Sequence, residues 1–203
     1  MLKRLFAALT AAAALAGLAT PAWADKDAEA LIKRIASDVI DTAKADKAIQ
    51  GGDVSRIITL VDAKVMPSVN FEVMTRSAVG PQWRSATPDQ RSKLMAEFKT
   101  LLVRVYSGAL TQIKDQTVEI TRTQAVPGSS QVVVQSEVRG KGEPIKLDYR
   151  LDKADAAWKI IDVNVGGIWL VTSYRSQFAQ ELSAGGIDGL IAKLAERNKA
   201  AKS

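Results

Sequence analysis

The side chains that most often carry out acid–base or nucleophilic chemistry are scarce in this sequence, which contains neither histidine nor cysteine. Imidazole proton shuttles, Ser-His-Asp catalysis, thiol chemistry and metal sites built on either side chain are therefore excluded. Catalysis would have to depend on carboxylates, lysine, tyrosine or serine, and neither a GxGxxG nor a GxxxxGK phosphate-binding motif occurs. We expect no metal and no cofactor.

Two carboxylates are the remaining candidates for proton transfer. Asp148 is followed by Tyr149, but neighbours on a strand point to opposite faces and do not readily share a pocket. Asp162 alternates with Trp158 and Ile160, which predicts that it is buried on their apolar face. A buried carboxylate needs a partner, so a structural salt bridge is the simpler interpretation, and a general base at the bottom of a pocket is the alternative.

The N-terminal residues have the pattern of a leader for export. Two basic residues precede an apolar stretch over 5–18, and Ala22-Trp23-Ala24 supplies the small residues of a cleavage site. The stretch is shorter than the ~20 residues that span a bilayer, and the chain has no cysteine for lipid attachment. We therefore expect residues 1–24 to be a cleaved signal peptide.

The next part of the chain has the periodicity of amphipathic helices. This pattern predicts helices over 28–43, 54–65, 71–79 and 88–113. The last of them begins at Thr87-Pro88-Asp89-Gln90, where threonine, proline and glutamine occupy the positions of a capping box with proline at the first helical position. Its apolar stripe is wider than a two-helix contact needs, so we expect it in the middle of the protein.

At about residue 116 the period changes from 3.6 to 2, which is typical of strands. Four strands with short turns between them are predicted over 118–121, 131–139, 145–152 and 158–165, and they form an antiparallel meander. After Gly166-Gly167 the chain returns to helix, with a break at Gly185-Gly186. Helices, then a sheet, then helices is an α+β pattern, and we expect residues 25–203 to form one compact domain.

The remaining feature of the sequence is the set of apolar faces on the predicted helices and strands. These faces predict a filled core or a lined cavity, and composition does not distinguish the two. The net charge of +6 is modest, and no run of arginine or lysine is interleaved with aromatic residues, so we expect no nucleic-acid partner.

Four segments share their order and spacing with one family pattern. They are residues 80–91, with Trp83-Arg84 ahead of the capping box; 106–110, Tyr-Ser-Gly-Ala-Leu; 166–171; and 185–190. On these segments the chain resembles the MlaC (toluene-tolerance) family of periplasmic phospholipid-binding proteins. It departs from the family pattern at Trp169, where a small residue is usual.

The resemblance implies a periplasmic carrier that moves phospholipid between outer and inner membranes and maintains outer-membrane lipid asymmetry. It implies a nuclear-transport-factor-like cone in which helices pack on a strongly twisted sheet around an apolar cavity. The cavity would hold the acyl chains non-covalently, with the head group outside. The implied partners are phospholipid, an outer-membrane lipoprotein–porin complex, and an inner-membrane ABC transporter with a lipid-binding periplasmic subunit. No catalytic residue is implied.

The apolar faces predicted above are then the candidate walls of this cavity. The expected lipid-binding residues are Phe71, Met74, Phe98, Leu102, Tyr106, Leu110, Val134, Val138, Leu147, Tyr149, Val165, Tyr174 and Phe178. Two other functions stay open: a cofactor-free isomerase or hydrolase on the same fold, with Asp162 as its ionisable group, and an assembly factor that binds only proteins.

Export predicts a defined start for the mature protein. Cleavage after Ala24 leaves a chain that begins Asp25-Lys26-Asp27. N-terminal sequencing of protein purified from the periplasm should therefore read these three residues, and a start upstream of Ala22 would contradict the predicted site.

Overall fold

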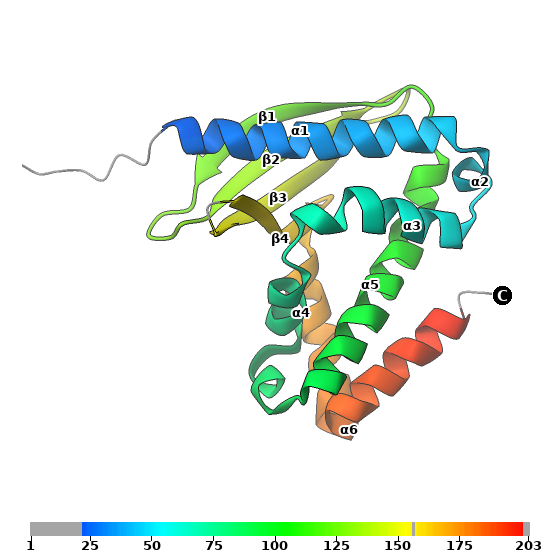
Figure 1. Cartoon of the computed structure of the whole chain (residues 1–203), viewed down its shortest axis with the longest axis vertical. Helices are drawn as coiled ribbons and strands as arrows, with labels where there is room; N and C mark the ends of the chain where they lie inside the picture. Colours follow the sequence, from blue (N-terminus) through cyan, green and yellow to red (C-terminus); the bar gives the residue numbers. More distant parts are fainter. Residues whose placement is uncertain (1–21, 156, 201–203) are drawn as a thin grey trace, which may run out of the picture.

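The computed structural model describes residues 22–155 and 157–200. The helices are α1 (Ala22–Ala45), α2 (Lys47–Gln50), α3 (Val54–Lys64), α4 (Phe71–Val79), α5 (Pro88–Thr111) and α6 (Leu170–Ala200), with 3₁₀ helices at Met66–Ser68 and Gly80–Ser85. The strands are β1 (Thr117–Ala125), β2 (Val132–Arg139), β3 (Ile145–Ala154), β4 (Ala157–Val165) and β5 (Ile168–Trp169). The predicted α+β class is confirmed, and α1, α4 and α6 contact the sheet (Figure 1).

The predicted signal peptide lies outside the described residues except for 22–24, which begin α1, so its cleavage stays a prediction.

Local sequence signals explain where several helices begin and end. At the start of α5, the Gln90 amide N–H donates to the Thr87 hydroxyl, and the Thr87 N–H donates to the Gln90 side-chain oxygen. The predicted capping box is therefore formed. Helix α4 has its predicted bounds: the Asn70 side chain accepts from the Val73 N–H, and Gly80 ends the helix at φ 75°, a conformation that favours glycine.

The sheet has five strands rather than the four predicted. All pair antiparallel in the order β1-β2-β3-β4-β5, and the additional strand β5 joins Ile168 to Val165 and Trp169 to Asn164. The Gly166-Gly167 turn that precedes it has φ values of 58° and 95°, which allow the chain to reverse within two residues. A two-residue strand has no periodicity of its own, so the sequence pattern did not indicate it.

One face of the sheet, called the inner face below, carries Val134, Tyr149 and Val163 as cross-strand neighbours. Helix α1 lies along this face (Figure 1). Their contact forms the sheet cluster, whose buried members are Ala28, Ile32, Ile35, Val132, Val134, Leu151, Trp158 and Ile160. The apolar side chains that α1 repeats every three to four residues are thus withdrawn from water against the sheet.

Helices α4, α5 and α6 form a second core below the sheet in Figure 1. Its buried members, called the helix cluster, are Ala78, Val79, Trp83, Leu94, Phe98, Leu101, Leu170, Tyr174, Phe178, Leu182, Leu190 and Leu194. Helix α5 packs on α3, α4 and α6, so its predicted central position is confirmed. Helix α6 bends at Gly186 (φ 62°), where the sequence predicted a break, and folds its second half back beside the first.

The expected face of Asp162 is wrong. The register between β3 and β4 shifts, so that Leu151 pairs with Ile160 but Arg150 pairs with Asp162. This β-bulge leaves Ile160 on the inner face and turns Asp162 to the opposite, outer face. A bulge reverses the alternation on which the prediction depended.

Asp162 is paired with backbone N–H groups at the start of a helix rather than with the cation of a salt bridge. Its Oδ1 accepts hydrogen bonds from the N–H groups of Val163 (2.9 Å) and Val171 (3.0 Å), and Val171 lies in the first turn of α6. Burial raises the pKa of Asp162, while these two hydrogen bonds and the charge of Arg150 oppose the shift. The buried carboxylate thus ties the start of α6 to β4.

Substitutions at Asp162 test this contact. Asp162→Ala removes both acceptor bonds and should cost about 1–2 kcal/mol of unfolding free energy, whereas Asp162→Asn keeps the acceptor oxygen and should cost less. Because the folded-state pKa is raised, the stabilising contribution of the carboxyl is fully present below its ordinary pKa and is lost as the pH rises through the folded-state value.

The Asp162→Asn protein should therefore gain stability relative to the wild type as the pH rises above about 4, the ordinary pKa of an aspartate. Denaturant unfolding of both variants across this range measures the effect. If Asp162→Ala and Asp162→Asn lose the same unfolding free energy at every pH, Asp162 does not hold α6 by its acceptor oxygen.

Candidate functional site

Part of the inner face of the sheet lies beyond the sheet cluster. Val138, Ile145, Leu147, Val165 and Ile168 are neighbours there through the pairs Val138–Ile145, Leu147–Val165 and Val165–Ile168. We call these five residues the open strip. Ile145 and Ile168 are 52% and 60% exposed, and the other three are half-buried. An apolar surface of this kind, continuous over the four strands β2 to β5, is uncommon without a function.

Helix α5 supplies apolar side chains toward the same region. Leu102 and Tyr106 are half-buried and pack against the helix cluster, as does Val165 of the open strip. The edge of the helix cluster therefore connects the strip on the sheet with the side of α5. Leu110 lies elsewhere: it packs against the cluster formed by Ala43, Ile49, Ile57, Leu60, Val103 and Ile113.

Four aromatic rings fill the space next to the open strip and the side of α5. The ring of Phe98 lies 4.9 Å from Tyr174, 5.1 Å from Phe178 and 5.6 Å from Phe71, measured between centroids. The first two contacts are edge-to-face, the arrangement that aromatic quadrupoles favour. Phe98 and Phe178 are fully buried, so this aromatic group is a packed floor rather than an open space.

The phenols near this region are held in their neutral form. Burial raises the pKa of Tyr106, Tyr149 and Tyr174 above the ordinary value for tyrosine. For Tyr149 the Ser136 hydroxyl opposes the shift, and the charge of Asp148 adds to it. Neutral phenols present an apolar ring and one hydrogen-bonding group, which suits contact with an amphipathic ligand.

The structure divides the predicted lipid-binding residues into two groups. Phe98, Val134, Tyr174 and Phe178 are buried in packed clusters, and Met74 is buried as well. Half-buried are Phe71, Leu102, Tyr106, Leu110, Val138, Leu147, Tyr149 and Val165. Sequence reasoning missed Ile145, although its alternation with Leu147 was a usable signal, and Ile168, for which no periodic signal exists.

The carboxylates considered for proton transfer lie away from the open strip. Asp148 pairs with Gln135 on the outer face, opposite to Tyr149 as predicted, and burial raises its pKa. Asp162 is on the outer face as well. Among residues 22–155 and 157–200, no three histidine, cysteine, aspartate or glutamate side chains gather as metal ligands would. Within the same residues, no helix combines the length and apolarity needed to cross a membrane.

Trp169, the departure from the family pattern, is accommodated on the outer face. It pairs with Asn164, and the Arg150 guanidinium lies 4.5 Å from the centroid of its ring. This is a cation–π contact that reaches from β5 across β4 to β3. The bulky ring therefore leaves the open strip unaltered.

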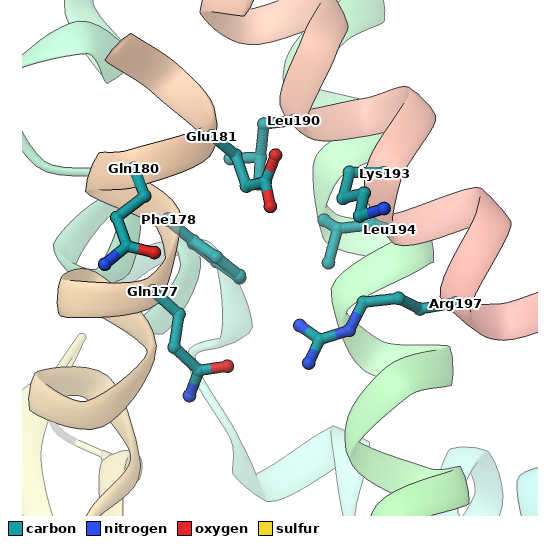
Figure 2. A pocket seen from close by; sticks show the side chains of 8 residues that line it. All are labelled: Gln177, Phe178, Gln180, Glu181, Leu190, Lys193, Leu194 and Arg197. Atoms are coloured by element: carbon teal, nitrogen blue, oxygen red, sulfur yellow. The ribbon is translucent and has the colours of Figure 1, made fainter. Parts of the chain in front are cut away.

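Two hollows in the surface have polar rims. One, of about 210 Å³, lies between the two halves of α6 (Figure 2). The other, of about 380 Å³, lies between α1 and β1 and is lined by Lys33, Ser37, Ile40, Asp41, Lys44, Gln116, Thr117 and Val118. Neither includes a residue of the open strip.

A half-open apolar surface bordered by neutral phenols, on an α+β fold, is typical of proteins that bind an apolar or amphipathic ligand. The family model described as MlaC protein matches residues 33–196. The chain belongs to the MlaC family, and the resemblance noted in its motifs is confirmed.

Known relatives agree with this assignment. The chain is 24% identical to the toluene tolerance protein ttg2D of Pseudomonas putida, over 84% of this chain and 83% of that one. It is 23% identical to the intermembrane phospholipid transport system binding protein MlaC of Haemophilus influenzae, over 95% and 92%. A solved structure of a phospholipid-binding protein from Ralstonia solanacearum, in complex with a phospholipid, is similar with a TM-score of 0.83 and 40% identity. It covers 87% of this chain and 99% of that one.

Paired tryptophan substitutions distinguish the open strip from the packed core. Val134→Trp adds a ring to a fully buried site under α1 and should cost typically 1–3 kcal/mol or more through overpacking. Leu147→Trp, on the adjacent strand and the same face, adds the ring within the half-open strip and should cost less than about 1 kcal/mol.

Unfolding free energies of the two ligand-free proteins give the answer. If Leu147→Trp destabilises the protein as much as Val134→Trp does, the strip is an ordinary core and the site must lie elsewhere.

Proposed function

We propose that this protein is a periplasmic phospholipid carrier. It holds acyl chains non-covalently against the open strip and the neighbouring side of α5, with the head group at the surface. One observation carries the proposal: the apolar strip formed by Val138, Ile145, Leu147, Val165 and Ile168 is incompletely covered by the protein's own helices. The Ralstonia solanacearum relative, solved with a phospholipid, supports the choice of ligand.

The energetics favour a carrier that retains its ligand until it meets a partner. Each methylene group withdrawn from water contributes ~0.8 kcal/mol, so two acyl chains with roughly 30 methylenes gain on the order of 20 kcal/mol gross. A lipid held in this way leaves very slowly into water. Release therefore requires direct contact with a membrane protein that offers the chains another apolar surface.

The route of the lipid forms the rest of the proposal. The carrier exchanges phospholipid with an outer-membrane lipoprotein–porin complex and with an inner-membrane ABC transporter bearing a lipid-binding periplasmic subunit. Its effect is to maintain the lipid asymmetry of the outer membrane. The intermembrane transport system named for the Haemophilus influenzae relative supports this role.

The isomerase or hydrolase alternative receives no support from the position of its only candidate group. Asp162 lies on the outer face, and its Oδ1 is occupied by the N–H groups of Val163 and Val171. A general base must reach the proton that it removes. Substrate bound at the open strip would lie on the other side of the sheet.

Extraction of the natively purified protein tests the proposal. Organic extraction and mass spectrometry should recover phospholipid in a stoichiometric amount. Leu147→Trp should lower the lipid content, because the added ring occupies part of the space for the chains. Gln124→Trp, which adds the same ring at an exposed position on the outer face, is the matched control and should leave the lipid content unchanged.

The other functions give different results. A protein without lipid that turns over a substrate would support the isomerase or hydrolase, and a protein without lipid or turnover would support the assembly factor. Either result contradicts the carrier.

A further inference from the structure

The cleft within α6 is a second feature of the molecule that could contact a ligand. Helix α6 reverses direction at Gly186, and its two halves enclose a hollow of about 210 Å³. Gln177, Phe178, Gln180 and Glu181 line it from the first half, and Leu190, Lys193, Leu194 and Arg197 from the second (Figure 2).

The cleft has an apolar floor and polar walls. Phe178, Leu190 and Leu194 form the floor and are buried members of the helix cluster. At one end, Figure 2 shows Glu181 near Leu190. At the other end, the Arg197 side chain reaches toward the first half of the helix, on the side where Gln177 lies. An anion is therefore favoured at the Arg197 end and disfavoured at the Glu181 end.

Arg197 has no direct partner within residues 22–155 and 157–200. Lys193, one turn earlier, is paired with Glu196 at 2.9 Å, and this pair leaves the Arg197 guanidinium without a carboxylate in contact. The Gln177 amide makes one long hydrogen bond, 3.4 Å, to the Ser173 hydroxyl. Several of the donors of a planar guanidinium are thus available to an incoming group.

The cleft adjoins the aromatic group that borders the proposed lipid site. Tyr174 precedes Phe178 by one helical turn, and its ring packs on Phe98 and Phe178. Burial raises the pKa of Tyr174, the nearby phenol of Tyr106 raises it further, and the charge of Arg197 lowers it. Phe178, which lines the cleft, contacts Phe98 and Tyr174, and Tyr106 packs against the same helix cluster, so the cleft adjoins the edge of the proposed site.

We propose that Arg197, assisted by the Gln177 amide, binds the phosphodiester group of the phospholipid whose acyl chains occupy the open strip. This inference rests on the proposed function. A guanidinium matches two phosphate oxygens with two parallel N–H groups, and the bond is charge-assisted. The phosphodiester is common to all glycerophospholipids, so such a contact positions the lipid at the surface without selecting its head group.

Binding of two lipids that differ only in the phosphate group tests the proposal. Delipidated protein is titrated with phosphatidylethanolamine and with diacylglycerol of the same acyl chains. Arg197→Gln should weaken phosphatidylethanolamine binding by about tenfold or more and leave diacylglycerol binding unchanged. Lys199→Gln removes the same charge from an exposed position of α6 that does not line the cleft, and it should alter neither affinity.

Equal affinities in the wild type and Arg197→Gln, or equal losses for both lipids, would overturn the proposal. Inorganic phosphate distinguishes the source of the anion. If phosphate bound at Arg197 by ³¹P NMR while phosphatidylethanolamine affinity did not depend on Arg197, the cleft would be a site for free phosphate and the head-group assignment would be wrong. If neither the wild type nor any variant binds either lipid, the proposed function is overturned together with the role of Arg197.

Discussion

Incomplete cover of one apolar surface is the constraint on which the rest of this protein depends. The inner face of the sheet carries apolar side chains along its length, and α1 covers only the part that includes Val132, Val134 and Leu151. Covering all of it would stabilise the protein alone but leave nothing for a ligand. The open strip is the part left uncovered, and α5 and α6 border it without filling it. Stability and the proposed lipid binding thus use the same apolar face at different places.

The remaining architecture keeps that strip open. The aromatic group around Phe98 is tightly packed, so it holds α4, α5 and α6 as one unit. Asp162 fixes the start of α6 to β4 through two backbone hydrogen bonds. The buried carboxylate therefore anchors α6 to the sheet, and the aromatic group carries α4 and α5 with it. The position of this anchor determines how much space remains between the helices and the open strip.

In the proposed complex, the same arrangement separates the apolar and polar parts of the lipid. The inner face offers hydrocarbon and neutral phenols, whereas the exposed end of the α6 cleft offers the charge of Arg197. The carboxylates that the sheet carries at Asp148 and Asp162 are turned to the outer face. An acyl chain in contact with the strip consequently meets neither carboxylate, which would be costly to desolvate without compensation.

Local sequence by itself determined most helix limits and the order of the main strands. The Thr87 capping box, the Asn70 cap and Gly80 act within a few residues of the chain, so their effects were readable without the fold. The motifs at 80–91 and 185–190 also identified the family. Tertiary structure alone decided the face of Asp162, because a bulge set by pairing with β3 reversed the alternation. It likewise decided which apolar residues are core and which are open: Val134 and Leu147 have the same pattern in sequence, and only the position of α1 buries the first and leaves the second half-exposed.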